Sequence, residues 1–156
     1  MEPPGQGDGK GNLHSVPAQE SGILVYGEQR GSALCDFDED GRVDLVVTEN
    51  GAATRLFRNQ RAKPGLRIRL NGPPGNPQGI GATLRLVYGQ TMGPAREIHS
   101  GSGYWSQDSA VPVMAQASSP ASLWVRCPGG KTTTAAIPAD AHEIVADDQG
   151  KITKVH

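Results

Sequence analysis

The stretch ALCDFDEDGRVDLVV, residues 33–47, places a dense acidic loop between two short apolar segments. Counted from Asp36, carboxylates stand at loop positions one, three, five and nine, and Gly41 stands at position six. Alternate residues of an extended chain point to the same side, so the first three aspartates converge, while the glycine permits a sharp turn. Oxygen ligands at this density favour Ca²⁺, and without a cation the carboxylates would repel one another. The candidate ligands are Asp36, Asp38, Asp40 and Asp44.

The flanks of this loop decide between the known kinds of calcium loop. An EF-hand loop lies between helices and carries a bidentate glutamate at position twelve, where this chain has Val47. Residues 43–48 are apolar and rich in β-branched side chains, which predicts a buried strand, and residues 32–35 lead into the loop from the other side. The sequence therefore predicts a loop between two strands, which excludes an EF-hand and a dockerin-type loop. The alternative is a solvated acidic turn.

Two further segments complete this first unit. Residues 22–27 are a short apolar run bounded by glycines, which predicts a strand, and Asn50-Gly51 predicts a hairpin turn into residues 54–57. With about four short strands, residues 27–59 resemble an FG-GAP/VCBS repeat, the motif of a β-propeller blade. The resemblance implies that the four aspartates bind Ca²⁺ through their side chains and that Arg42 contributes its backbone carbonyl.

The remainder of the chain predicts a second all-β unit. Residues 66–70 alternate, with leucine and isoleucine facing inward and Arg67 and Arg69 facing outward. Further strands are predicted at residues 82–88, 96–99, 123–127, 132–137, 142–146 and 151–155. No segment shows sustained helical periodicity, so residues 66–156 predict a small antiparallel β-sandwich or barrel. Before it, the sequence predicts a disordered or loosely docked tail at residues 1–20, the repeat at residues 21–60 and a linker at residues 61–65.

Several short motifs in this second unit occur together in one known family. They are Asn76, Gly79-Ile80-Gly81-Ala82, Gly101-Ser102-Gly103-Tyr104, Ser106-Gln107 and Val125-Arg126-Cys127-Pro128-Gly129-Gly130. By these residues the unit resembles an ASPIC/UnbV domain, which characteristically follows VCBS repeats. The order of the two units implies the C-terminal part of a larger VCBS-repeat protein of the cartilage-acidic-protein type.

Two positions depart from that family pattern. Cys127 stands where a tryptophan is usual, and residues 113–117 replace a run similar to Phe-Gly-Leu-Gly. Trp124 lies three residues away and would project to the opposite face of its strand, so it does not replace the missing ring. That corner of the unit is therefore expected to lose packing, at a cost of several kcal/mol unless something else fills the space.

Composition narrows the classes of function. The chain has 15 Lys and Arg against 16 Asp and Glu, and this net charge of −1 favours neither nucleic acid nor an anionic membrane as a partner. No apolar run is long enough to cross a membrane, and residues 1–15 lack the pattern of a secretory signal. Cys35 and Cys127 are either a disulfide or two free thiols, and their apolar surroundings favour free thiols.

Three motifs resemble catalytic or nucleotide-binding signatures but lack essential parts. Residues 130–132 (GKT) lack the earlier glycine and the following helix of a phosphate loop, and residues 79–81 (GIG) lack the last glycine of a dinucleotide pattern. Ser102 lies near His99 and Asp108 in the sequence, but the residue two before it is not the glycine that a nucleophile elbow needs. The histidines lack the spacing of a zinc site. The sequence therefore predicts no enzyme.

Two features are candidate ligand surfaces. Tyr104 and Trp105 follow a Gly-Ser-Gly segment, and they form either a sugar-stacking pair or a plug at the edge of the domain. Arginines between positions 55 and 69 predict a solvated strand face or, alternatively, a patch for anionic glycans, with Arg67 and Arg69 as candidate contacts.

These features predict a non-catalytic, calcium-binding module of extracellular type that acts in adhesion or ligand recognition, with Ca²⁺ fixing a strand-connecting loop. The alternative is a carbohydrate-binding accessory domain that uses the aromatic loop and the arginine face. A further alternative is an enediyne-type biosynthesis-associated protein or a hydrolase. The expected partners are a protein or glycan ligand, or the missing blades of a longer parent protein. The resemblance implies a secreted or cell-surface location.

Overall fold

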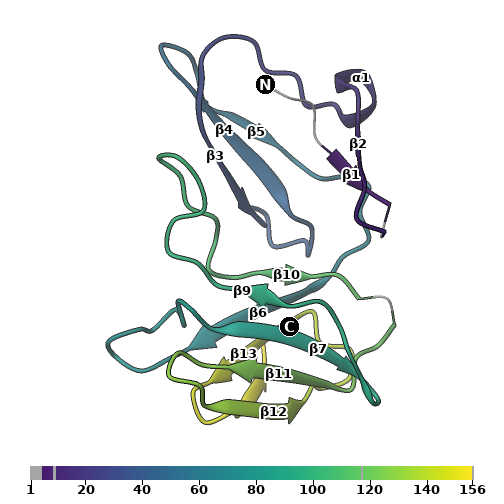
Figure 1. The fold of residues 1–156 in the computed structure, drawn as a ribbon, viewed down its shortest axis with the longest axis vertical. Coiled ribbons are helices and arrows are strands. Elements are labelled where there is room, and N and C mark those ends of the chain that lie inside the picture. The colour runs from purple at the N-terminus through teal and green to yellow at the C-terminus, as the bar shows by residue number, and fades with distance from the viewer. Residues whose placement is uncertain (1–4, 9, 117, 156) are drawn as a thin grey trace.

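The computed structural model describes residues 5–8, 10–116 and 118–155 of the chain, which are all-β apart from one short helix (Figure 1). The elements are β1 (Gly5–Gly7), β2 (Leu13–Ser15), α1 (Ala18–Ser21), β3 (Gln29–Cys35), β4 (Asp44–Glu49), β5 (Arg55–Phe57), β6 (Leu66–Asn71), β7 (Thr83–Tyr88), β8 (Thr91–Met92), β9 (Arg96–Glu97), β10 (Val113–Met114), β11 (Ser122–Arg126), β12 (Thr132–Ala136), β13 (Glu143–Asp147) and β14 (Ile152–Lys154). The predicted all-β class is confirmed. No helix in the described part is long and apolar enough to cross a membrane.

The N-terminal region consists of the hairpin β1–β2, the single turn α1 and the antiparallel sheet β3–β4–β5. β3 and β4 are the strands predicted on either side of the acidic loop, and β5 follows the predicted turn at Asn50-Gly51. The strand predicted at residues 22–27 is wrong, because Gly22 ends α1 with a φ of 73° and the residues after it join no sheet. The sheet therefore has three strands rather than about four.

The segment predicted as a tail holds regular structure where it is described. It carries β1, β2 and α1, and the side chains of Leu13–Ser15 are exposed. Residues 1–4 and 9, which belong to the same prediction, lie outside the described residues. The hairpin is thus formed by backbone pairing, without apolar burial of its second strand.

The C-terminal region, from β6 onward, is built from two sheets. One has the order β10-β6-β13-β14, and the other has the order β12-β11-β7-β8, with β9 also pairing with β7. β6 and β13 run parallel, so the prediction of a purely antiparallel unit is wrong at this pair. A parallel pair needs a long crossover, and here the crossover contains the other sheet. Neither sheet closes on itself among the described residues, so the predicted barrel alternative is also wrong.

One apolar core is shared by these two sheets. Its buried members are Leu66, Ile68, Ala82, Leu84, Leu86, Ile98, Met114, Leu123, Val125, Ile144 and Ala146. The strands β6, β7, β11 and β13 each contribute to it, which is the pattern that alternating apolar residues predict for a sheet with one covered face. Separating the sheets would expose this whole set to water, so burial of apolar surface stabilises the region.

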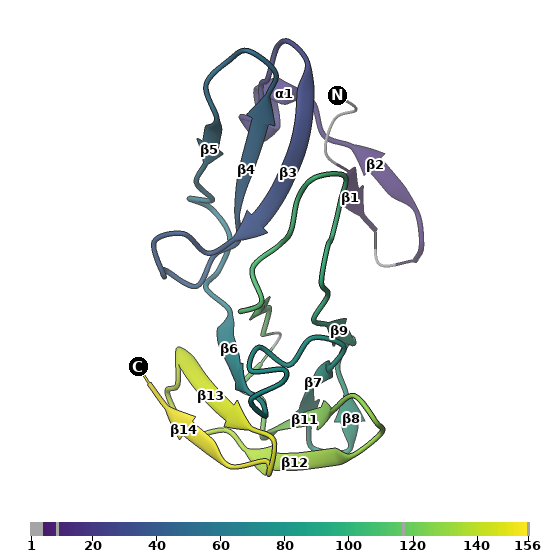
Figure 2. The same ribbon diagram turned by 90° about the vertical axis from the view of Figure 1, so that its left-hand side faces the viewer.

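A long loop of the C-terminal region lies along the edge strand β3 (Figure 2). The backbone N–H of Ser109 donates to the carbonyl of Leu34 at 2.8 Å, and the N–H of Leu34 donates to Oδ1 of Asp108 at 2.8 Å. Gly31 lies close to the same loop, since a Cβ built there would be 3.1 Å from the carbonyl oxygen of Trp105. The loop therefore covers an edge that would otherwise expose unpaired backbone groups.

Candidate metal centre

The acidic loop is a tight turn between β3 and β4 that is organised by its first aspartate. Oδ1 of Asp36 accepts the backbone N–H of Asp40 at 3.0 Å, and its Oδ2 accepts the N–H of Gly41 at 2.9 Å. Glu39 and Gly41 have positive φ values of 59° and 79°, which reverse the chain direction. Gly41 also accepts a backbone hydrogen bond from Gly65 at 2.8 Å, which fixes the loop against the segment that begins β6.

This turn brings three of the predicted ligands together. One carboxylate oxygen each from Asp36, Asp38 and Asp40 lies within 4.8 Å of the other two. Asp44 is placed differently: it is 2% exposed, and its two oxygens accept the backbone N–H groups of Phe37 at 2.9 Å and Asn59 at 2.8 Å. In this structure Asp44 therefore connects the start of the loop to the segment after β5, and the cluster consists of the first three aspartates.

Each aspartate of this cluster is paired with its own arginine. Nη1 of Arg67 lies 2.6 Å from Asp36, and Nη1 of Arg42 lies 2.7 Å from Asp40. Arg58 pairs with Asp38. The sequence suggested that the carboxylates need a cation to offset their repulsion, but the three guanidinium groups already supply the compensating charge. Any metal ion at this site has to compete with these arginines.

The three pairs differ in how much solvent they see. Arg58 and Arg42 have side chains that are 55% and 27% exposed, whereas Arg67 and Asp36 are 6% and 1% exposed. Exposed ion pairs contribute only about 0–1 kcal/mol, so the first two arginines can leave their carboxylates at small cost. The Asp36–Arg67 pair is different, because separating it would leave two charges without partners in a buried place.

Arg67 is the centre of a buried charge network that joins the loop to the C-terminal region. Its Nε donates to Glu143 at 2.7 Å, its Nη1 to Asp36 at 2.6 Å and its Nη2 to Glu39 at 3.2 Å. Glu143 also accepts from Arg69, at 3.1 Å. The predicted outward position of Arg67 is wrong, because the loop and β13 cover that part of β6 and leave the residue 5% exposed. Arg69, at 48% side-chain exposure, does face solvent.

The network changes the proton affinities of its members. Burial opposes the charged form of Arg67, but its hydrogen bonds to Glu143 and Asp36 outweigh that effect and raise its pKa. Burial likewise favours neutral Glu143, but hydrogen bonds from Arg67 and Arg69 outweigh it and lower the pKa of that carboxyl. Both residues are therefore held in their charged forms at neutral pH.

The two cysteines are free and half-buried, as their apolar surroundings predicted. Cys35 precedes the acidic loop, and burial together with the carboxylates of Asp44, Asp36 and Asp108 raises its pKa. A thiol with a raised pKa forms little thiolate, so Cys35 is poorly suited to nucleophilic chemistry.

The residues of the considered hydrolase triad make separate contacts. The hydroxyl of Ser102 accepts the backbone N–H of Asp108 at 2.5 Å, and the carboxylate of Asp108 accepts the N–H of Leu34. His99 lies 3.7 Å from Glu97 and is 57% exposed. Ser102 and Asp108 thus help to shape the loop that lies along β3.

Tyr104 and Trp105 lie at the tip of that loop. Their rings stack with centroids 5.5 Å apart and an interplanar angle of 22°, and the residues are 70% and 81% exposed. Trp105 has a φ of 56°, a backbone conformation that is unusual for a bulky residue, and it lies in the tight reversal between the paired residues Gly103 and Ser106. The pair does not plug the edge of a sheet but stands in solvent.

Sequence reasoning missed Arg58, Glu39 and Glu143 as members of the charge networks. Arg58 was visible only as part of a basic stretch, and Glu143 lies 76 positions from Arg67. Neither a scan against models of protein families nor a search of curated proteins finds a match for this chain.

Proposed function

We propose that this chain is a non-catalytic Ca²⁺-binding module of extracellular type, in which the ion fixes the loop between β3 and β4 for adhesion or ligand recognition. The observation that carries the proposal is the convergence of Asp36, Asp38 and Asp40 within 4.8 Å around a turn with two positive φ values. All the side-chain donors are oxygens, which suits Ca²⁺ rather than zinc or copper.

The donor set leaves room for the remaining ligands that Ca²⁺ takes. Asp38 and Asp40 have side chains that are 24% and 29% exposed, so water can reach their oxygens. The carbonyl of Arg42, at loop position seven, is the proposed backbone ligand, and Asp44 holds the start of the loop to the segment after β5. A bound ion would supply positive charge to three carboxylates at once, whereas each arginine pairs with only one aspartate of the cluster.

The proposed architecture is one propeller-type blade followed by a β-sandwich, as in FG-GAP/VCBS and ASPIC/UnbV units. The three-stranded sheet supports this idea, because it leaves apolar residues partly exposed on both faces: Leu34 is 38% exposed and Leu56 is 40% exposed. A lone blade cannot bury its faces, so neighbouring blades of a longer chain are proposed partners. A secreted or cell-surface location is part of the same proposal.

Calorimetry of the full chain with CaCl₂ and MgCl₂ after EDTA treatment tests the metal site. We expect uptake of Ca²⁺, weak uptake of Mg²⁺ and a rise in Tm on adding Ca²⁺. The variant Asp38→Ala should lose the uptake, while Glu97→Gln, an exposed carboxylate on β9, should keep it. If Asp38→Ala binds Ca²⁺ as the wild type does, the loop is a solvated acidic turn and the proposal fails.

A second candidate function is carbohydrate binding through the aromatic loop. It is favoured by the exposed, stacked pair Tyr104 and Trp105, since aromatic rings that stand in solvent can stack on the apolar face of a sugar. Arg69 pairs with Glu143 but is 48% exposed and can meet an anionic group from the solvent side, whereas Arg67 is buried and cannot. A glycan array with the wild type and Trp105→Ala tests this function. Binding that is equal for both proteins would exclude the aromatic loop as the sugar site.

A further inference from the structure

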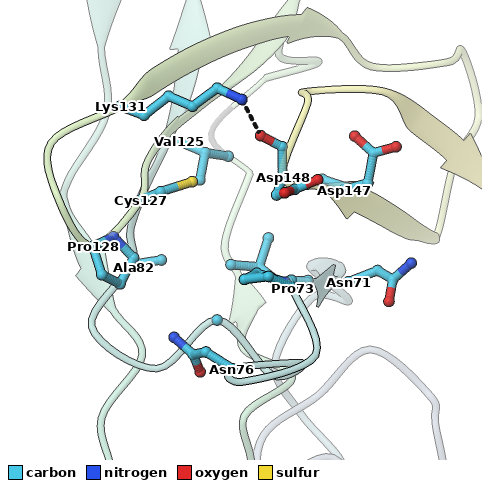
Figure 3. A pocket seen from close by; sticks show the side chains of 14 residues that line it. Asn71, Pro73, Asn76, Ala82, Val125, Cys127, Pro128, Lys131, Asp147 and Asp148 are labelled. Atoms are coloured by element: carbon cyan, nitrogen blue, oxygen red, sulfur yellow. Dashed lines mark hydrogen bonds between the residues drawn. The ribbon is translucent and has the colours of Figure 1, made fainter.

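A cavity of about 280 Å³ opens in the C-terminal region (Figure 3). Its inner surface is formed by Leu70, Ala82, Val125 and Ala146, of which the last three are at most 4% exposed. These residues come from both sheets, and three of them also belong to the apolar core, so the cavity adjoins that core. β6 joins the cavity to the acidic loop: Arg67 near its start meets the loop, and Leu70 near its end lines the cavity.

The walls of the cavity are held by local bonds and do not depend on a ligand. The side chain of Asn76 both donates to the carbonyl and accepts from the N–H of Ile80, each at 2.9 Å. Gly79 has a φ of 67°, and a Cβ there would lie 2.5 Å from Cδ1 of Leu70, so only glycine lets this loop close over the leucine. A cavity with fixed walls costs a ligand little ordering free energy.

Cys127 and Pro128, from the turn after β11, form the facing wall. Figure 3 shows the thiol of Cys127 beside Val125, with Pro128 and Pro73 on different sides of the opening. The sequence predicted lost packing at this corner, where a cysteine stands in place of a larger ring. Thiol, proline and aliphatic side chains give an apolar space that can accept a flat ring.

The rim of the cavity carries more negative than positive charge. Nζ of Lys131 already donates to the carbonyl of Asp148 at 2.8 Å and to Oε1 of Gln149 at 3.0 Å. Oδ1 of Asp147 accepts two backbone N–H groups, at 3.0 and 2.8 Å. Lys131 therefore reaches Asp148 through the backbone carbonyl and not through the carboxylate. One lysine against two aspartates favours a cationic group at this side.

We propose that this cavity binds a small organic amine with a flat apolar body, the body lying on the apolar inner surface and the ammonium lying at Asp147 and Asp148. A cavity of about 150 Å³ is known to hold benzene, so about 280 Å³ has room for a bicyclic ring. The site shares no residue with the acidic loop, and the inference goes beyond the calcium-binding function.

The test uses three probes that share one ring system and differ in charge: tryptamine, indole and indole-3-acetate. Binding to the full chain is followed by isotope-edited NMR, with EDTA present in a parallel series. We expect tryptamine to bind about fivefold more tightly than indole and indole-3-acetate to bind more weakly than indole, since an exposed charge pair contributes about 1 kcal/mol. EDTA should change nothing, which separates this site from the metal centre.

Three variants locate the site. Cys127→Trp should fill the cavity and abolish binding of all three probes, and Cys127→Leu serves the same purpose with a smaller side chain if the first variant does not fold. Asp148→Asn should weaken tryptamine and leave indole unchanged. Cys35→Ala, the matched change at the other free thiol, should leave all three affinities unchanged.

Thiol alkylation gives an independent readout, because tryptamine should slow modification of Cys127 and not that of Cys35. The proposal is overturned if none of the probes binds, if binding persists in both filled variants, or if indole-3-acetate binds most tightly.

Discussion

Eleven buried apolar side chains form the core of the C-terminal region. In the sheet β3–β4–β5, by contrast, Val47 alone among the described apolar side chains is buried. Both regions are built from short strands with β-branched residues, so strand propensity does not explain the difference. The C-terminal region has a second sheet to cover its apolar face, and the N-terminal sheet has none. Strands alone therefore form a sheet here, but a second layer is needed to form a core.

The N-terminal sheet is connected to the rest of the chain mainly by polar contacts. The loop between β9 and β10 pairs with β3 through Leu34, and Arg67 holds Asp36 of the acidic loop. Polar contacts of this kind depend on geometry and charge, so they respond to pH, salt and substitution in ways that an apolar core does not.

The largest effect is expected from Arg67→Ala, which removes the centre of the buried network. Asp36 would keep its negative charge in a buried place without an arginine partner, Glu143 would keep only its pair with Arg69, and breaking such a network typically costs about 3–5 kcal/mol. Urea unfolding of the variant measures the loss. Arg69→Ala is the matched control, since its exposed pair with the same glutamate should cost less than about 1 kcal/mol. Equal losses in the two variants would show that the network does not join the regions.

A matched pair of leucine substitutions compares the two regions directly. Leu84→Ala removes a fully buried side chain from the C-terminal core and should cost about 2–5 kcal/mol. Leu56→Ala, in a strand of the N-terminal sheet that leaves it 40% exposed, should cost about 1 kcal/mol or less. Thermal unfolding of both variants gives the two values. A larger loss for Leu56→Ala would mean that the N-terminal sheet has a covering surface that buries Leu56.

The sequence predicted those parts of the molecule that depend on neighbouring residues. The spacing of the aspartates and Gly41 predicted the turn, and the flanking apolar runs predicted β3 and β4, because a hairpin is a local structure. The parallel pairing of β6 with β13 was not predictable in this way, since it joins segments more than seventy residues apart. The prediction of a strand at residues 22–27 was wrong, because a short apolar run forms a strand only where a partner strand pairs with it.

The candidate sites also differ in whether neighbouring residues or distant segments form them. Asp36, Asp38 and Asp40 come from one turn, and their convergence followed from alternation. The burial of Arg67 depends on where the whole N-terminal sheet packs, and alternation within β6 alone placed this residue in solvent. The cavity is formed by strands of both sheets together with loops that meet only after both sheets are assembled, and Cys127 was its single signal in the sequence.

A third prediction concerns pH. The pKa of Glu143 is lowered in the folded state, so its stabilising contribution is complete above the ordinary glutamate pKa and is lost as the pH falls through the lower, folded value. Stability measured by urea unfolding between about pH 7 and about pH 3 should therefore fall at the acidic end. Glu143→Gln should be less stable than the wild type at neutral pH, and the gap between them should narrow in acid. A gap that stays constant would mean that Glu143 does not contribute through its charge.

The smallest effect is expected at the exposed edge of the metal centre. Arg58 occupies the Asp38 carboxylate and is 55% exposed, so Arg58→Ala should free a proposed ligand at little cost to the fold. Ca²⁺ no longer has to displace a guanidinium, and its affinity should rise by up to about fivefold, the equivalent of about 1 kcal/mol.

Arg61→Ala is the control for this prediction. It removes an exposed charge from the same segment that has no carboxylate partner in the cluster, so it reports the long-range electrostatic change alone. Titration calorimetry at low and high salt separates the two effects, because screening reduces the long-range term more than direct competition. An affinity that rises equally in both variants would show that Arg58 acts only through the general field and does not compete with Ca²⁺ for Asp38.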